Sequence, residues 1–177
     1  MGVTAVILLV ISKIWQKLDS VEILPVIFDF NAILLGLALA LGIILGSVII
    51  YYLWEDYRLS SQMYLELIIK PLAWPDLIWL GLLPGLSEEL LFRGVILPAL
   101  GFNTTALIFS SILFGVLHLS GAKQWSYAVW ATIVGFVLGY AALVTGNLLV
   151  PIVAHVVTNF VSGCIWKAAQ LQQVNKS

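Results

Sequence analysis

Charged residues are scarce in this chain of 177 residues: they make up 10% of it, whereas a soluble domain carries about 25%. Hydrophobic residues make up 62%, and the mean hydropathy is +1.08. The net charge is −1, so no basic surface indicates a nucleic-acid partner. This composition predicts an integral membrane protein that has the lipid bilayer as its first partner.

Cysteine is nearly absent as well. The one cysteine, Cys164, excludes an intrachain disulfide, and its apolar neighbours predict a small buried hydrophobic side chain. The chain also lacks an H-E-x-x-H zinc motif, a glycine-rich phosphate loop, and a serine or cysteine beside an evident base. The apolar N-terminus has no basic region and no A-x-A site, so a removed signal peptide is not expected.

Long apolar runs predict the fold class, an all-α multi-pass transmembrane bundle of about six spans with one helix on the membrane surface. The first helix, residues 3–18, is short for a span, and residues 55–70 are polar enough to lie at the interface. The other predicted spans are 31–54, 76–100, 103–119, 125–145 and 148–166. Gly135 and Gly139, four residues apart, predict close contact between helices.

The predicted organisation has three parts: N-terminal membrane helices with an interfacial segment (1–74), a catalytic membrane core (75–167) and a polar tail (168–177). The distribution of lysine and arginine predicts the orientation. With six spans, one side holds Arg58, Lys70, Lys123, Lys167 and Lys176, and the other holds Lys13 and Lys17. We therefore expect cytoplasmic termini, in a bacterial inner membrane or an organellar equivalent.

Three charges lie deep in apolar sequence, since Glu88, Glu89 and Arg93 are the only charged residues between Asp76 and Lys123. Each costs about 2.5–3.5 kcal/mol in a membrane, so such residues persist when they pair, face water or do chemistry. Glu89 and Arg93 are spaced i, i+4 with the acid first, which predicts a supporting ion pair. Glu88 faces about 100° away and has no partner in its own helix, which favours a functional role.

A helix start is predicted beside these charges. Pro84-Gly85 interrupts the apolar run, and Ser87 follows as a plausible N-cap with both carboxylates in the first turn. A helix N-terminus stabilises carboxylates, which is one physical way to keep Glu88 ionised in a membrane.

The two histidines of the chain, His118 and His155, both lie in predicted spans. Phe114 precedes His118 by four residues and is placed to fix its ring, while His155 and Asn159 share one helix face. These groups suit the addition of water to a carbonyl, with Glu88 and His118 activating the water and His155 and Asn159 stabilising the oxyanion. Alternatively, Glu88, His118 and His155 form a zinc ligand triad with an open fourth position, although their local spacing does not indicate a metal.

Three motifs built from these residues resemble those of the CPBP family of intramembrane proteases, which includes the type II CAAX prenyl endopeptidases and bacterial Abi-type proteins. Glu88 to Arg93 fits E-E-x-x-x-R, Phe114 to His118 fits F-x-x-x-H, and His155 to Asn159 fits H-x-x-x-N. Each motif alone is weak, but three in order on successive membrane helices are specific. The resemblance covers about residues 75–167.

The resemblance implies an endopeptidase acting on a membrane-embedded or lipidated polypeptide. It assigns water activation to Glu88 and His118, the oxyanion hole to His155 and Asn159, and support to Glu89 and Arg93. The family has been described both as metalloproteases and as glutamate-dependent proteases. We favour the glutamate-dependent form without a cofactor, and zinc is the alternative. Eukaryotic members cut prenylated CAAX proteins, a substrate that is less expected for a chain that looks bacterial or organellar.

Two other functions fit the same residues. One is a non-catalytic membrane immunity or partner-binding protein of the same family, in which the polar cluster serves helix association. The other is a small transporter with Glu88 as a proton relay, which the short chain and the lack of an evident internal repeat disfavour.

Overall fold

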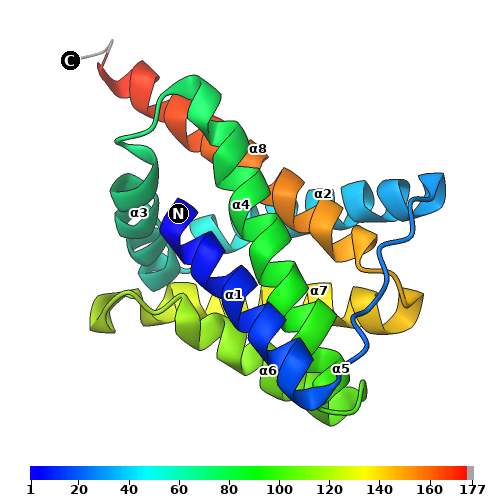
Figure 1. The fold of residues 1–177 in the computed structure, drawn as a ribbon. Coiled ribbons are helices and arrows are strands. Elements are labelled where there is room, and N and C mark those ends of the chain that lie inside the picture. The colour runs from blue at the N-terminus through cyan, green and yellow to red at the C-terminus, as the bar shows by residue number, and fades with distance from the viewer. Residues whose placement is uncertain (175–177) are drawn as a thin grey trace.

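The computed structural model describes residues 1–174, and the regular elements in this range are all helical (Figure 1). The all-α part of the fold class predicted from the sequence is therefore confirmed. Eight α-helices are joined by two short 3₁₀ turns, η1 and η3, and by one π-helical segment, η2. In chain order the elements are α1 (Gly2–Asp19), α2 (Phe30–Leu53), α3 (Glu55–Ile69), η1 (Trp74–Asp76), α4 (Leu77–Glu89), η2 (Leu90–Ile96), α5 (Leu97–Ala99), α6 (Thr104–Leu117), η3 (Ala122–Gln124), α7 (Trp125–Thr145) and α8 (Leu149–Val174).

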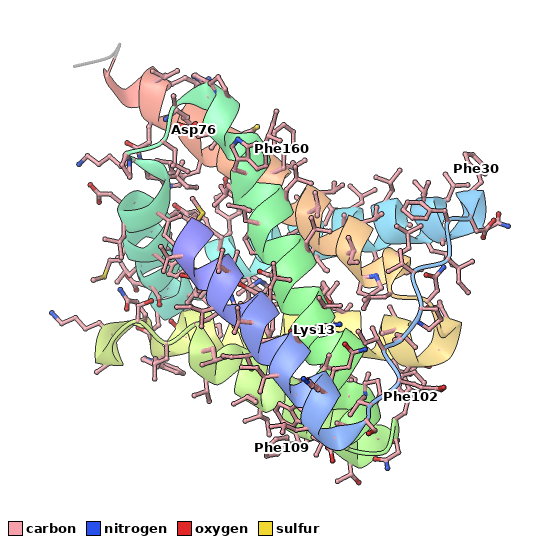
Figure 2. All side chains as sticks on the ribbon, viewed as in Figure 1. Lys13, Phe30, Asp76, Phe102, Phe109 and Phe160 are labelled. Carbon is pink, nitrogen blue, oxygen red and sulfur yellow. The ribbon has the colours of Figure 1, made fainter. Side chains whose placement is uncertain are left out.

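Helix α4 lies at the centre of the bundle and packs along α8, which in turn packs on α2 (Figure 1). Helices α6 and α7 form a second pair, and α1 lies against α4 and η2. Many outward side chains are apolar: Phe30 and Phe109, for example, project from the periphery and are 70% and 54% exposed (Figure 2). Such an exterior suits a lipid environment, because a soluble monomer rarely exposes so continuous an apolar surface.

Small residues set the distance between the paired helices. A Cβ added at Gly139 would lie 2.5 Å from Leu107 Cδ1, and one at Gly135 would lie 3.1 Å from Phe114 Cδ1. The close contact predicted from these two glycines is therefore confirmed, and the partner is α6. Between α4 and α8 the close neighbour is a backbone atom, since a Cβ at Gly81 would lie 2.7 Å from the Val156 backbone oxygen.

Gly81→Ala is expected to push α4 away from α8, because the added methyl would meet backbone atoms that cannot rotate aside. Overpacking of this kind costs about 1–3 kcal/mol, so the purified variant should unfold at a lower temperature. Gly42→Ala in α2 is the matched control: nothing lies within 4 Å of its added Cβ, so stability should hold or rise. Equal melting temperatures for Gly81→Ala and the unmodified protein would contradict the proposed packing.

The number of spans differs from the expected six. Within residues 1–174, three helices are long and apolar enough to cross a membrane: Phe30–Leu53, Ala122–Thr145 and Leu149–Gln172. A fourth span is counted only if α3 and the Trp74–Ala99 segment, bent by 111°, are taken together. Helix α6 has 14 residues and is about 21 Å long, shorter than the hydrocarbon core of about 30 Å. Helix α1 carries Lys13, Lys17 and Asp19 within 18 residues.

The predicted break at Pro84-Gly85 is wrong, because α4 runs through Pro84 to Glu89 and continues into η2. Ser87 is not an N-cap; its hydroxyl donates to the Leu83 carbonyl at 2.7 Å. Proline is tolerated inside membrane helices where serine hydroxyls and local π geometry satisfy backbone groups. Glu88 therefore lies at the C-terminal end of α4 rather than at a helix start, and needs another source of stabilisation.

The last helix is longer than predicted. Helix α8 continues beyond the expected end at residue 166 as far as Val174, so most of the predicted polar tail is helical, and residues 175–177 lie outside the described range. Near the other end of the chain, the connector between α1 and α2 is fixed by Asn147. Its amide donates to the Ile27 carbonyl and accepts from the Ile27 N–H, at 2.8 and 2.9 Å.

Candidate active site

A cavity of about 590 Å³ is lined by residues of α1, α2, α3, α4, α6, α7 and α8. This volume is in the range of small-molecule and peptide sites. Its walls are mainly aliphatic and aromatic, with polar groups gathered on α4, α6 and α8. Six polar residues that line it come from α4, from α8 and from the C-terminal end of α6: Ser87, Glu88, His118, His155, Thr158 and Asn159. The four residues predicted to act on water, Glu88, His118, His155 and Asn159, thus line one cavity.

Glu88 and His118 face each other across the junction of α4 and α6. Glu88 Oε2 lies 3.7 Å from His118 Nε2, and the two side chains are only 16% and 17% exposed. The Oε2 atom is buried and has no hydrogen-bond partner among the described residues. A buried carboxylate without a compensating group is costly. For Glu88 the nearest such group is the His118 ring.

The contact of the other ring nitrogen of His118 indicates where the protons of the Glu88–His118 pair lie. His118 Nδ1 lies 2.8 Å from the Phe114 carbonyl oxygen, which can only accept, so Nδ1 carries a proton. A neutral ring would then present Nε2 as an acceptor to a carboxylate that is also an acceptor. A proton between Nε2 and the carboxylate resolves this conflict. The geometry suits an imidazolium–carboxylate pair.

Glu89, Arg93 and His155 form a second, fully buried cluster. Glu89 Oε1 lies 2.7 Å from Arg93 Nη1 and 2.7 Å from His155 Nδ1, and the Glu89 side chain is 0% exposed. Arg93 Nη2 donates to the Gly135 carbonyl at 2.7 Å, which connects the cluster to α7. The predicted Glu89–Arg93 ion pair is present, and Glu89 additionally fixes the orientation of the His155 ring. The π geometry of η2 is common at functional sites.

The Phe114 ring contacts both clusters. Its centroid is 4.6 Å from that of His118, at a tilt of 38°, and 5.9 Å from that of His155 in an edge arrangement. The Arg93 guanidinium carbon lies 4.6 Å from the same centroid, which adds a cation–π contact. The supporting contact predicted between Phe114 and His118 is therefore found, and this one ring separates and positions the two charged groups.

Three tyrosines form an aromatic wall that the sequence did not indicate. Tyr127 of α7 stacks on Tyr64 of α3 at 4.3 Å and lies parallel to Tyr57 of α3 at 6.4 Å. The Tyr127 ring is also 6.3 Å from the His118 ring. Burial, together with the Glu88 charge, raises the pKa of Tyr64 to about 12, so this hydroxyl stays protonated at neutral pH. These tyrosines come from two different helices, α3 and α7, and the sequence of neither helix contains a motif that marks them as part of a site.

The zinc alternative fits the structure less well than the water-activating arrangement. Within residues 1–174, no three histidine, cysteine, aspartate or glutamate side chains meet as a metal-binding group. His155 Nδ1 is held by Glu89, while His118 Nδ1 is held by a backbone carbonyl. These contacts leave Nε2 of both rings free and do not themselves exclude a metal, but among the described residues Glu88, His118 and His155 do not meet as a ligand triad. The single cysteine, Cys164, is partly buried.

Comparison with known proteins adds sequence evidence to this geometry. A family model described as Type II CAAX prenyl endopeptidase Rce1-like matches residues 70–161, which contain all four predicted site residues. The chain is 31% identical over 141 residues to the uncharacterized protein YpbD of Bacillus subtilis (strain 168), covering 77% of this chain and 69% of YpbD. No solved structure matches the chain.

Two further relatives match over smaller parts of their lengths. The uncharacterized protein YyaK of Bacillus subtilis (strain 168) is 38% identical over 81 residues, covering 41% of this chain and 27% of YyaK. Autophagy-related protein 22 of Schizosaccharomyces pombe is 32% identical over 108 residues, covering 60% of this chain but 18% of that protein.

The helical fold with its apolar spans and the family match support a membrane protein of the CAAX-protease type. The chain belongs to the Rce1-like family. At the level of the family, this membership supports a CAAX-protease type of function.

Proposed function

We propose that this protein is an intramembrane endopeptidase that hydrolyses a peptide bond in a membrane-embedded or lipidated polypeptide. The observation that carries the proposal is the placement of Glu88 3.7 Å from His118, at the end of a mainly apolar cavity that His155 and Asn159 also line. A water-activating pair and two hydrogen-bond donors at one cavity are what amide hydrolysis needs.

In the proposed reaction, a water bound at the Glu88 carboxylate attacks the carbonyl carbon of the substrate. Glu88 takes one proton from this water as the new C–O bond forms, and the carbonyl becomes an oxyanion. The Glu88–His118 pair then gives a proton to the amide nitrogen, the C–N bond breaks, and an acid and an amine leave. His118 keeps the pair supplied with one mobile proton, because both its nitrogens face acceptors.

His155 and Asn159 stabilise the oxyanion in this mechanism. Glu89 accepts from His155 Nδ1, so the second ring nitrogen donates a hydrogen bond when His155 is an imidazolium. Asn159 lies one turn further along α8 and supplies an amide N–H to the same cavity. Arg93 offsets part of the Glu89 charge, which keeps the cluster compatible with its burial.

No cofactor is needed for these steps, and the test is direct. Dialysis of the purified protein against a chelator is expected to leave its peptidase activity within about twofold, and metal analysis is expected to find less than one zinc per chain. Loss of activity that zinc restores would overturn the metal-free form of the mechanism.

We also propose that both termini lie in the cytoplasm. A fluorescent reporter fused to the C-terminus should then be fluorescent, and a reporter that is active only in the periplasm should be inactive at the same position.

The proposed function is tested by comparing membrane peptides from cells with the active protein and cells with Asn159→Ala. Polypeptides cut in one sample only identify the substrate and the bond. The purified protein is assayed in parallel with a fluorescent farnesylated CAAX peptide, the lipidated substrate named by the family, and with its unprenylated form. Equal fragments with both proteins, and no cleavage of either peptide, would favour the non-catalytic immunity or partner-binding alternative.

A further inference from the structure

The cavity face of α8 carries more polar groups than the reaction uses. His155, Thr158, Asn159 and Ser162 all line the cavity, and their spacing of i, i+3, i+4 and i+7 places them on one helix face. His155 and Asn159 are one i, i+4 pair, and Thr158 and Ser162 are a second. The second pair is displaced along the helix by three residues, about 4.5 Å.

Serine and threonine inside a helix commonly bond back to the carbonyl four residues earlier. Several hydroxyls in this bundle do so: Ser12 to Leu8, Ser87 to Leu83, Ser111 to Leu107, Thr132 to Ala128 and Thr145 to Ala141, at 2.7–2.9 Å. This bond satisfies a polar group in an apolar surrounding, so it is the expected state for a threonine in a membrane helix.

Thr158 departs from this pattern. Its Oγ1 atom is buried and has no hydrogen-bond partner among the described residues. A buried hydroxyl without a partner costs about 1–3 kcal/mol, and the residue four positions earlier, Ala154, offers a carbonyl on the same helix. The Thr158 hydroxyl therefore does not form the usual bond to the carbonyl of Ala154. The residue lines the cavity, so rotation about its Cα–Cβ bond would let the hydroxyl bond to a ligand there.

We propose that Thr158, with Ser162, binds the main chain of the substrate next to the bond that is cut. An extended peptide advances about 3.3 Å per residue, so a displacement of about 4.5 Å from the oxyanion pair reaches the neighbouring peptide unit. Thr158 is a substrate-positioning residue in this arrangement and takes no part in proton transfer. This inference rests on the proposed function for the identity of the ligand, an extended polypeptide.

Thr158→Val removes the hydroxyl and keeps the shape of the side chain. The KM for the fluorescent lipidated peptide used above is expected to rise about tenfold, while kcat stays within about twofold. Because no internal hydrogen bond is lost, the melting temperature should stay the same or rise. Thr158→Ser should keep KM within about threefold, and Ser162→Ala should add to the effect of Thr158→Val.

The matched control is Thr132→Val, which makes the same substitution in α7 at a hydroxyl bonded to Ala128. It should leave KM and kcat unchanged. A fall in melting temperature for Thr158→Val with unchanged KM would assign Thr158 a purely structural role and overturn the proposal. A loss of kcat equal to that of Asn159→Ala would overturn the positioning role in favour of transition-state contact.

Binding separates this inference from the proposed function. In a Glu88→Gln background, the Kd of the same labelled peptide should rise about tenfold when Thr158→Val is added. Absence of cleavage by the unmodified protein would reject the proposed function, while the two Kd values would still decide the role of Thr158. An equal Kd with and without the hydroxyl, or no binding of the peptide, would overturn the inference.

Discussion

Glu88→Gln is expected to reduce peptide hydrolysis by about 10²–10⁴-fold, the usual contribution of a positioned general base. The amide has nearly the same size as the carboxylate but takes no proton from water. The fold should survive, because Glu88 makes no strong internal hydrogen bond: its closest charged partner is 3.7 Å away. The measurement is kcat for the lipidated peptide, together with a melting temperature for each preparation.

Glu66→Gln provides the matched control for this substitution. Its carboxylate is 59% exposed and pairs with Lys70 on the surface of α3, so the same change there should leave kcat unchanged. Glu88→Asp keeps the charge but withdraws it by about one methylene, and an intermediate loss is expected. Unchanged kcat for Glu88→Gln in well-folded protein would leave the hydrolytic mechanism without its base.

The role of Glu88 also shows how far sequence patterns reach in this protein. The positions of His118 and of the His155–Asn159 pair in two apolar segments indicated a shared site, and these residues do line one cavity with Glu88. Within each motif the paired residues are four positions apart, about one helical turn, so the spacing alone places them on one face of their helix. Which faces meet was predicted from chemistry, because unpaired polar groups in a membrane must find one another.

Tertiary packing decided the points that the sequence left open. Pro84 was expected to end a helix, but α4 runs through it while packed along α8. The bond between Glu89 and His155, 66 residues apart, has no signature in the local spacing of either residue. The six predicted spans are not confirmed, since apolar composition does not distinguish a helix that crosses the bilayer from a short one packed inside the bundle.

Arg93→Met is expected to cause the largest loss of stability, about 3–5 kcal/mol, the usual cost of removing one partner of a buried ion pair. Arg93 is 1% exposed and Glu89 is 0% exposed, so water cannot replace the missing partner. The substitution also removes the hydrogen bond to the Gly135 carbonyl, which holds η2 against α7. Chemical or thermal unfolding of the purified protein measures the effect.

Two comparison variants separate the loss of charge from the loss of packing. Arg58→Met breaks a surface pair whose carboxylate, Glu55, is 74% exposed, and it should cost at most about 1 kcal/mol. The double variant Glu89→Gln/Arg93→Met leaves no charge unpaired, so it should recover part of the stability lost in Arg93→Met. Recovery of stability without recovery of activity is expected, because the amide at position 89 no longer presents a carboxylate to His155 Nδ1. If Arg93→Met unfolds at the same denaturant concentration as Arg58→Met, the buried pair does not stabilise the bundle in the way its geometry indicates.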